Sequence, residues 1–263
     1  MLWEKPIESF RRIGVLRGSG SLAVGKDFVY AAADDHCLVL GRTTGAEARR
    51  LTLPDGKQAR EWGYLAVLDD TVIGSAVDHG GVYRTFGRDA IYAAGYGDNT
   101  KITVSNELFA HDANSSKQLW KYQPRGVILD PAIAVNEKYV LFLESRNAKT
   151  LTGPARSHYP ELLEAEGGDL VALDRKTGQP AWRQAFGSPK GIQTLFLSCT
   201  DREVVICFSR NTVSQGARTA TVHYEARVYE PTGKLRWQQS FNTGKRPNLD
   251  HGEQDRHPAI VGS

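Results

Sequence analysis

The sequence is poor in several features that would narrow the class of protein. Its 263 residues include three cysteines, Cys37, Cys199 and Cys207, and a single methionine. Such a sparse, odd set of cysteines supplies neither a disulfide framework nor a metal pattern, so we expect buried free thiols. No apolar run approaches the roughly 20 residues that a membrane-spanning helix needs. One methionine is also very few for a helical bundle.

The sequence also has little excess charge of either sign. Lys and Arg total 33 against 30 Asp and Glu, which leaves a net charge of +3 and no dense basic tract. Binding to nucleic acid depends on clustered cations, so nucleic acid is not expected as a partner. The N-terminal "MLWEKPIESFRR" has neither an apolar core nor a small-residue cleavage site, so no signal peptide is visible in this chain.

What the sequence does contain is an internal repeat, anchored on "LVALDRKTGQPAW" at 170–182. Weaker copies are "LFAHDANSSKQLW" (108–120), "VYEPTGKLRW" (228–237) and "CLVLGRTTGAEAR" (37–49), and the last has Arg49 where the others have tryptophan. The chain also opens on "MLWEKPI", with a tryptophan at the signature position. The residues of the structural repeat are Trp3, Trp120, Trp182, Trp237, Asp174, Gly45, Gly178 and Gly233.

Each copy has the pattern of a β-hairpin. An alternating strand enters a turn, where Thr-Gly supplies the left-handed position that glycine takes without strain. The next strand carries a tryptophan, a large plate suited to the space between two sheets. Two apolar strands joined by a polar turn precede each hairpin, so a unit has four antiparallel strands. That pattern predicts an all-β fold, a β-propeller with blades at about 21–53, 62–123, 131–186 and 193–241 and partial blades at 1–10 and 257–263.

This hairpin and its copies resemble the PQQ-like β-propeller repeat, and the resemblance covers nearly the whole chain. The repeat occurs in quinoprotein alcohol dehydrogenases and in outer-membrane assembly lipoproteins that act as interaction scaffolds. The resemblance implies a ring of about eight blades, so we expect this chain to be a fragment of a larger propeller. It also implies a periplasmic or other extracytoplasmic location. The open blade edges of such a fragment predict self-association.

Titratable residues gather in two loops that lead from a tryptophan strand into the next blade. "YQPRGVILDPAI" holds Arg125 and Asp130, and Asp130 takes the same place before Pro-Ala-Ile as a histidine in the second loop. We expect channel-mouth positions for the candidates Arg125, Asp130, His251, Glu253, Asp255 and His257.

Three interpretations of the second loop remain open. It is a metal or acid/base site, a polar loop that caps strands and pairs with neighbouring cations, or a binding site for an unknown ligand. The His-x5-His spacing is not an established zinc pattern, so no metal ligand and no catalytic residue are assigned.

The expected function is a non-catalytic scaffold that presents loops and blade edges to other proteins in the cell envelope. The alternative is a PQQ-dependent alcohol dehydrogenase. For that alternative the resemblance implies a quinone stacked on a tryptophan, a Ca²⁺ ion held by Glu, Asn and a catalytic Asp, and a disulfide between adjacent cysteines. The sequence has no adjacent cysteine pair, and Trp62 is the one candidate platform. We therefore predict no cofactor, with PQQ and Ca²⁺ retained as the alternative.

Overall fold

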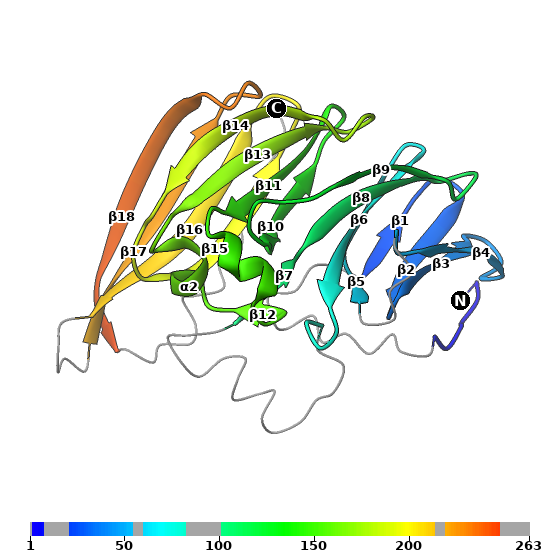
Figure 1. The fold of residues 1–263 in the computed structure, drawn as a ribbon, viewed down its shortest axis with the longest axis horizontal. Coiled ribbons are helices and arrows are strands. Elements are labelled where there is room, and N and C mark those ends of the chain that lie inside the picture. The colour runs from blue at the N-terminus through cyan, green and yellow to red at the C-terminus, as the bar shows by residue number, and fades with distance from the viewer. Residues whose placement is uncertain (1, 8–20, 55–59, 83–100, 214–218, 248–263) are drawn as a thin grey trace.

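The computed structural model describes residues 2–7, 21–54, 60–82, 101–213 and 219–247. These residues form four antiparallel β-sheets, which follow one another across the molecule in chain order (Figure 1). The predicted all-β class, built from four-stranded antiparallel sheets of the propeller type, is confirmed.

Three of the sheets have four strands in chain order. The first contains β1 (Leu22–Val24), β2 (Phe28–Ala33), β3 (His36–Gly41) and β4 (Glu47–Thr52). The second contains β5 (Arg60–Leu68), β6 (Thr71–Asp78), β8 (Glu107–Asp112) and β9 (Gln118–Tyr122). The fourth contains β15 (Ile192–Cys199), β16 (Val204–Val213), β17 (Thr219–Tyr229) and β18 (Leu235–Pro247).

The third sheet has six strands and departs from the expected pattern. Its order is β12 (Arg156–Ser157), β7 (Ile102–Ser105), β10 (Ile128–Val135), β11 (Tyr139–Ser145), β13 (Gly168–Asp174) and β14 (Pro180–Gly187). β7 comes from the insertion after β6, and β12 from the insertion after β11. Both strands are short and pair with strands distant in sequence, so no hairpin signal announces them. Together they extend the inner edge of the sheet.

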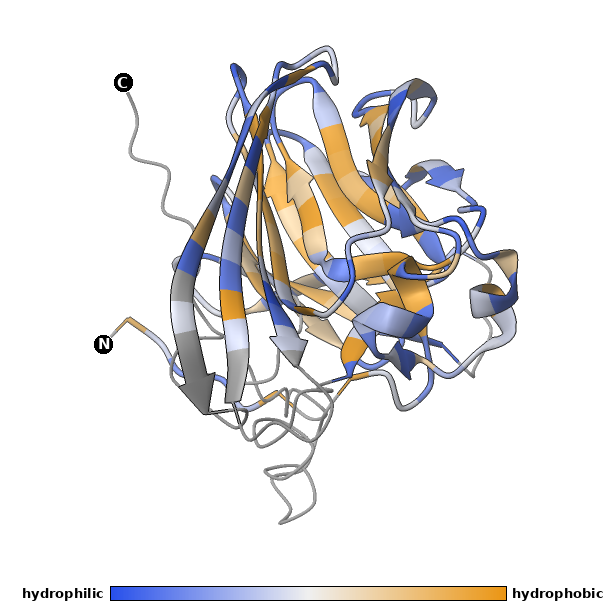
Figure 2. Cartoon of the chain, turned by 90° about the vertical axis from the view of Figure 1, so that its left-hand side faces the viewer, coloured by the Kyte–Doolittle hydropathy of each residue, from blue (hydrophilic) through white to orange (hydrophobic). Residues whose placement is uncertain are grey.

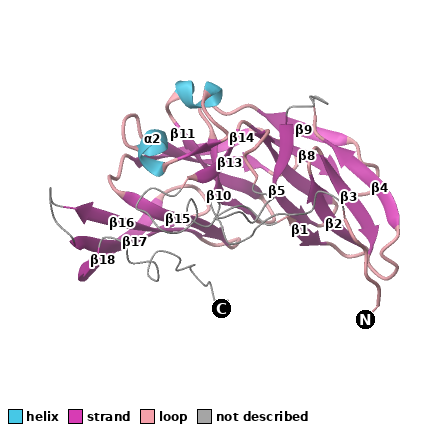
Figure 3. Ribbon diagram, turned by 90° about the horizontal axis from the view of Figure 1, so that it is seen from below, coloured by secondary structure: helices cyan, strands magenta, loops and turns pink. Residues whose placement is uncertain are grey.

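The sheets are arranged as a fan. The first strands of neighbouring sheets contact one another, β1 with β5, β5 with β10 and β10 with β15. Seen from below, the successive sheets follow an arc (Figure 3). The fan places β1, β5, β10 and β15 towards the inside and the strand after each hairpin turn on the outside.

The strands of the sheets carry many hydrophobic residues, coloured orange in Figure 2. Separate buried clusters lie between the first and second, the second and third, and the third and fourth sheets. A smaller fourth cluster covers the outer side of the first sheet, where Trp3 and Ile7 pack on Ala31, Leu38 and Leu40. Burial of a large apolar side chain contributes roughly 1.5–3 kcal/mol, so these layers hold the fan together.

Among the described residues, helical structure is confined to the insertion between β11 and β13. It consists of η1, a 3-10 helix (Ala148–Thr152), and α2 (Tyr159–Leu163), which buries Tyr159, Leu162 and Leu163 in the core beside the fourth sheet. The Ser145 hydroxyl donates to the Leu162 carbonyl at 2.6 Å and ties this insertion to β11. Within the described ranges, no helix has the length and apolar character needed to cross a membrane.

Candidate functional site

Tryptophan side chains contact the hairpin turn of the sheet that follows them in the chain. Trp120 on β9 reaches the turn between β13 and β14, where its indole N–H donates to the Arg175 carbonyl at 2.8 Å. The indole lies on Gly178 so closely that a Cβ at this glycine would stand 2.5 Å from the ring. Gly178 also has a φ of +69°, in the region that favours glycine. Backbone conformation and contact with the indole both require glycine here.

Two further tryptophans make the same contact. In each, the indole N–H donates at 2.8 Å to the carbonyl one residue after the start of the turn, and the ring lies on the positive-φ glycine. The sets are Trp3 with Arg42 and Gly45, and Trp182 with Pro231 and Gly233. The repeated tryptophan and the repeated glycine thus form the two sides of one contact between sheets. We call each such contact between neighbouring sheets a seam.

Trp237 differs from the wedged position expected of it. It is 47% exposed on β18, the last described strand. The reason is positional, because a tryptophan of this type lies on the turn of a following sheet and no such sheet is described after β18.

Arginine replaces tryptophan at the seam between the first and second sheets. Arg49 on β4 donates to the carbonyl of Ala113, which occupies the same turn position as Arg175 in the third sheet. Its guanidinium lies 4.6 Å from the centre of the Phe28 ring. The glycine position of this turn is taken by Ser116, whose φ is +63°. The donor to the turn carbonyl is therefore retained while the indole and its glycine are lost together.

Arg175 strengthens the neighbouring seam. Its side chain is only 6% exposed and donates to the Leu68 carbonyl at 2.9 Å and to the Asp69 carboxylate at 3.0 Å, both in the turn between β5 and β6. A third bond reaches the Glu137 carbonyl at 2.9 Å. The turn that receives Trp120 thus also binds the second sheet through the hydrogen bonds of Arg175. The sequence analysis missed this role.

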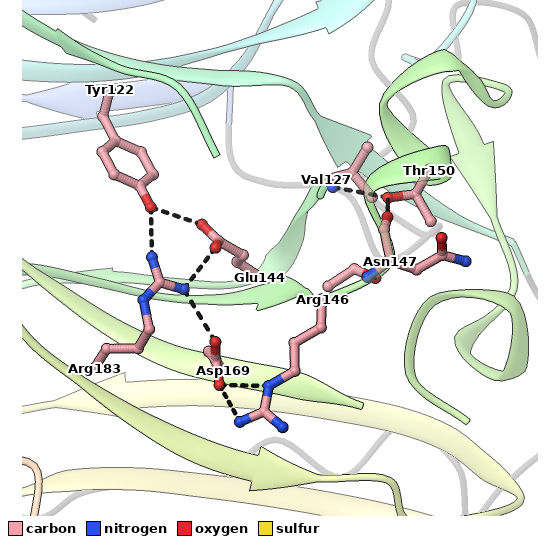
Figure 4. Close-up of polar contacts among 9 residues, drawn as sticks. Tyr122, Val127, Glu144, Arg146, Asn147, Thr150, Asp169 and Arg183 are labelled. Atoms are coloured by element: carbon pink, nitrogen blue, oxygen red, sulfur yellow. Dashed lines mark hydrogen bonds and ion pairs between the residues drawn. The ribbon is translucent and has the colours of Figure 1, made fainter. Parts of the chain in front are cut away.

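The opposite end of the sheets carries a network of buried charges (Figure 4). Arg183 on β14 donates to Glu144 on β11 at 2.6 Å and to Asp169 on β13 at 3.2 Å. Tyr122, from β9 of the second sheet, donates to Glu144 at 2.8 Å and accepts from Arg183 at 2.9 Å. Arg146 completes the network by donating to Asp169 at 2.8 Å. We call this region, where β11 ends and β13 begins, the polar end.

This network is structural in character. The side chains of Glu144 and Asp169 are 1% and 5% exposed, and both face arginine. Burial raises the pKa of Tyr122 far above its ordinary value, and the Glu144 charge raises it further. Tyr122 therefore stays a neutral phenol, suited to hold the second sheet against the third and not to exchange protons.

The acidic residue of the polar end recurs in three sheets. It lies five residues before the first residue of the hairpin turn, at Glu107, Asp169 and Glu225. Each one pairs with arginine: in the other two sheets, Glu107 lies 3.4 Å from Arg60 and Glu225 lies 2.5 Å from Arg210. The fixed distance from the turn was a readable signal that the sequence analysis did not use.

A covering loop fixes the start of β10. Thr150 of η1 accepts a bond from the Val127 amide at 3.0 Å and donates to the Asn147 carbonyl at 2.6 Å (Figure 4). A Cβ at Gly126 would lie 2.5 Å from the Ser145 carbonyl. The insertion after β11 therefore closes over the loop that leads into β10.

The two described channel-mouth candidates lie in different environments. Asp130 is 1% exposed and accepts a hydrogen bond from Ser105 on β7. The Ser105 and Ser75 hydroxyl oxygens lie 2.7 Å apart, within hydrogen-bond distance, and Ser75 also accepts from the Tyr64 amide at 2.7 Å. Asp130 is thus enclosed between the second and third sheets, which differs from the channel-facing position expected, whereas Arg125 is exposed. The β7 strand, invisible from sequence, causes this enclosure.

The other four candidates, His251, Glu253, Asp255 and His257, lie outside the described residues. In the part of the chain that the structure describes, no group of three or more His, Cys, Asp or Glu side chains could hold a metal ion.

The residues do not fit a stacked quinone at the one tryptophan considered for it. Trp62 is fully buried, with the Phe109 ring centroid 4.9 Å away at an edge and the His111 ring stacked at 6.1 Å. Its indole N–H donates to the Tyr64 carbonyl at 2.9 Å. Neighbouring side chains occupy the space that a quinone would need.

The fold and the repeated seams are of the β-propeller type, and the repeats resemble PQQ-like repeats. Residues 166–254 match the family model described as outer membrane protein assembly factor BamB. A curated relative, the outer membrane protein assembly factor BamB of Burkholderia pseudomallei (strain K96243), is 24% identical over 144 residues, which are 54% of this chain and 32% of that protein. These matches confirm the resemblance noted in the sequence.

Two solved structures resemble the chain at lower identity. The crystal structure of BamB from Moraxella catarrhalis has a TM-score of 0.47 and 12% identity, and the match covers 87% of this chain and 52% of that one. The structure of apo AztD from Citrobacter koseri has a TM-score of 0.47 and 13% identity, with 88% and 48% covered. The chain spans about a third of the curated relative and about half of each solved chain.

Proposed function

We propose that the chain is a non-catalytic protein-interaction scaffold of the extracytoplasmic cell envelope, of the kind that takes part in outer-membrane protein assembly. The observation that carries the proposal is the match of residues 166–254 to the BamB family model. That stretch begins just before β13, includes the Trp182 seam and runs to the end of β18.

The geometry of the described chain supports a scaffold over an enzyme. Several of its buried acids pair with arginine and hold strands and sheets together, as Glu144 does with Arg183. A buried pair of this kind is costly to break, which suits a structural role. What remains free to meet other molecules is a set of exposed loops on rigid sheets, a common arrangement for binding surfaces.

We propose the loops of the polar end as the surface that meets partner proteins. Arg125, in the loop between β9 and β10, and Lys149, in η1, are both exposed there. The pairing of Ile128 with Glu144 places the Arg125 loop beside the end of β11, where η1 follows. The hairpin turns at the opposite end are occupied instead by the tryptophan contacts and, in the second sheet, by Arg49.

Site-specific photo-crosslinking in the organism that encodes the protein tests this proposal. A photoreactive residue at position 125 or 149 should give adducts with outer-membrane β-barrel proteins or their assembly machinery. The matched control is position 117, an exposed lysine in the β8–β9 turn at the opposite end, which should give none. Equal adducts at all three positions, or none at any, would contradict the choice of surface.

The non-catalytic part of the proposal has its own test. After incubation of the protein with PQQ and Ca²⁺, we expect no quinone absorbance on the purified chain and no dye-linked alcohol oxidation. Stoichiometric quinone uptake together with turnover would overturn the scaffold proposal in favour of the oxidoreductase.

A further inference from the structure

Among the described strands, β7 is the one that leaves the sheet of its chain neighbours. It lies between β6 and β8 in the sequence, and both of these belong to the second sheet. β7 instead pairs in the third sheet, where Val104 lies opposite Leu129 of β10 and Thr103 lies opposite Arg156 of β12. The chain therefore crosses from the third sheet to the second between β7 and β8.

The residue at the crossing, Asn106, is fixed to the second sheet. It alone separates β7 from β8. Its backbone N–H donates to the Ala76 carbonyl at 3.0 Å. Its side-chain oxygen accepts from Arg60 at 2.6 Å, and its side-chain nitrogen donates to Asp78 at 2.8 Å. Asn106 is thus bound to both β5 and β6.

The preceding residue, Ser105, is fixed to the third sheet. It pairs with Ile128 at the start of β10, and its hydroxyl donates to the Asp130 carboxylate, which is 1% exposed. Removing a hydrogen-bond donor from a buried carboxylate is costly, because no water replaces it there. Two adjacent residues are therefore bound to two different sheets.

Apolar burial holds the rest of β7 in the third sheet. Ile102 and Val104 are 0% and 3% exposed and belong to the core that the third sheet shares with the fourth. Between them, the Thr103 hydroxyl donates to the Gly81 carbonyl at 2.9 Å, in the segment that follows β6. β7 cannot leave the third sheet without exposing both apolar side chains.

We propose that β7 is a clasp that makes the second and third sheets open and close as one cooperative unit. To part the two sheets, β7 must separate from β10 and β12, or β8 must separate from β6, because a single residue links β7 to β8. Among the described strands, none crosses the seams on either side of this pair of sheets.

The clasp gives the loops of the polar end the support of two coupled sheets. It also assigns a structural role to Asp130, as the acceptor that holds β7 in place. This inference goes beyond the proposed function, because it holds whether or not the polar end binds a partner.

Native-state hydrogen exchange at increasing urea, followed by mass spectrometry of peptides, tests the clasp. In the wild-type chain, the slowest amides of β6 and of β11 should have protection factors within about threefold of each other at each urea concentration. Ser105→Ala removes the donor to Asp130 and should open a gap of about tenfold or more between the two strands, as loss of a buried hydrogen bond to a charged group does.

A second variant and a control make the test specific. Asn106→Ala weakens the clasp from the side of the second sheet and should open a gap of the same size. Ser209→Ala is the matched control, since Ser209 is 1% exposed and its hydroxyl lies 2.7 Å from that of Thr194 within the fourth sheet. It should leave β6 and β11 in agreement. A tenfold gap already present in the wild type, or agreement that survives in both clasp variants, would overturn the proposal.

Discussion

At the scale of single residues, the seams depend on glycines that combine a left-handed backbone with contact to an indole. Gly178 shows the two effects together, with a φ of +69° and Trp120 directly above it. The sequence motif predicted the first effect, because a tight turn of this type needs a left-handed position. The second depends on the next-door sheet, so it could not be read from the turn alone.

Alanine at Gly178 separates these two effects. Gly178→Ala should lower the free energy of unfolding by about 2 to 4 kcal/mol, from backbone strain and from the clash with Trp120. Gly187→Ala is the matched control, since Gly187 has a φ of +89° but nothing within 4 Å of the Cβ position, and it should cost about 1–2 kcal/mol. Urea denaturation measures both. Equal losses for the two variants would show that the indole contact is unimportant.

His111 is a buried histidine whose protonation makes the free energy of unfolding depend on pH. It is 4% exposed, and burial lowers its pKa although a hydrogen bond with the Ser116 carbonyl opposes the shift. A histidine with a lowered folded pKa contributes stability that is present above its unfolded pKa of about 6.5 and is lost as the pH falls through the folded value.

His111→Gln should therefore flatten the loss of stability on acidification. Between pH 7 and pH 5, denaturation midpoints of the wild type should fall more steeply than those of the variant, while above pH 7 the two slopes should agree. Parallel curves across the whole range would mean that the buried imidazole does not contribute to acid sensitivity.

At the scale of elements, the seam between the first two sheets has a different design from the others. Arg49 donates to the Ala113 carbonyl where the other seams use an indole, and Ser116 holds a φ of +63° where the others have glycine. A side chain at position 116 would collide with an indole from position 49, as the contact of Trp120 with Gly178 shows. The two departures from the repeat thus depend on each other.

A double-mutant cycle tests this dependence. Ser116→Gly alone should stabilise by roughly 1 kcal/mol by relieving the left-handed backbone, and Arg49→Trp alone should destabilise because the indole meets Ser116. The double variant should be more stable than the sum of the two predicts, by about 1 kcal/mol or more. Thermal or urea unfolding of the four chains measures the coupling, and strict additivity would refute it.

The sequence predicted local elements better than long-range ones. The polar stretch "TDRE" between two apolar strands is typical of a hairpin turn, and the structure pairs Cys199 with Val204 across it. The hairpin and tryptophan pattern predicted the antiparallel units in the same way. The strands β7 and β12 were missed because each pairs with a strand far away in sequence, and four residues or fewer carry no periodicity.

Contacts between residues distant in sequence also explain why parts of the candidate site were not predicted. Asp130 was expected at a channel mouth because of its place before Pro-Ala-Ile, but β7 brings Ser105 against it and encloses it. The Tyr122–Glu144–Arg183 network spans two sheets, so its members share no local pattern. The acidic residues five positions before the turns did share one, and a search for charged positions in the repeat would have found them.

At the scale of the whole molecule, the described residues form a row of sheets in which each sheet packs on its neighbours. Stability in such an array is close to a sum of units and seams, so each seam can be weakened by itself. The scaffold proposal depends on this rigidity, because loops at the polar end keep a fixed arrangement only while the sheets beneath them are locked together.

The most direct test of the seams compares two tryptophans in the same motif position. Trp120 is 7% exposed beneath the next sheet, whereas Trp237 is 47% exposed with no described sheet after it. Measured by urea unfolding at a concentration where the chain is monomeric, Trp120→Ala should lose about 3–5 kcal/mol of unfolding free energy. Trp237→Ala should change it by no more than about 0.5 kcal/mol. Equal losses at the two positions would contradict the account, because the indole would then matter for its own strand and not for the joining of sheets.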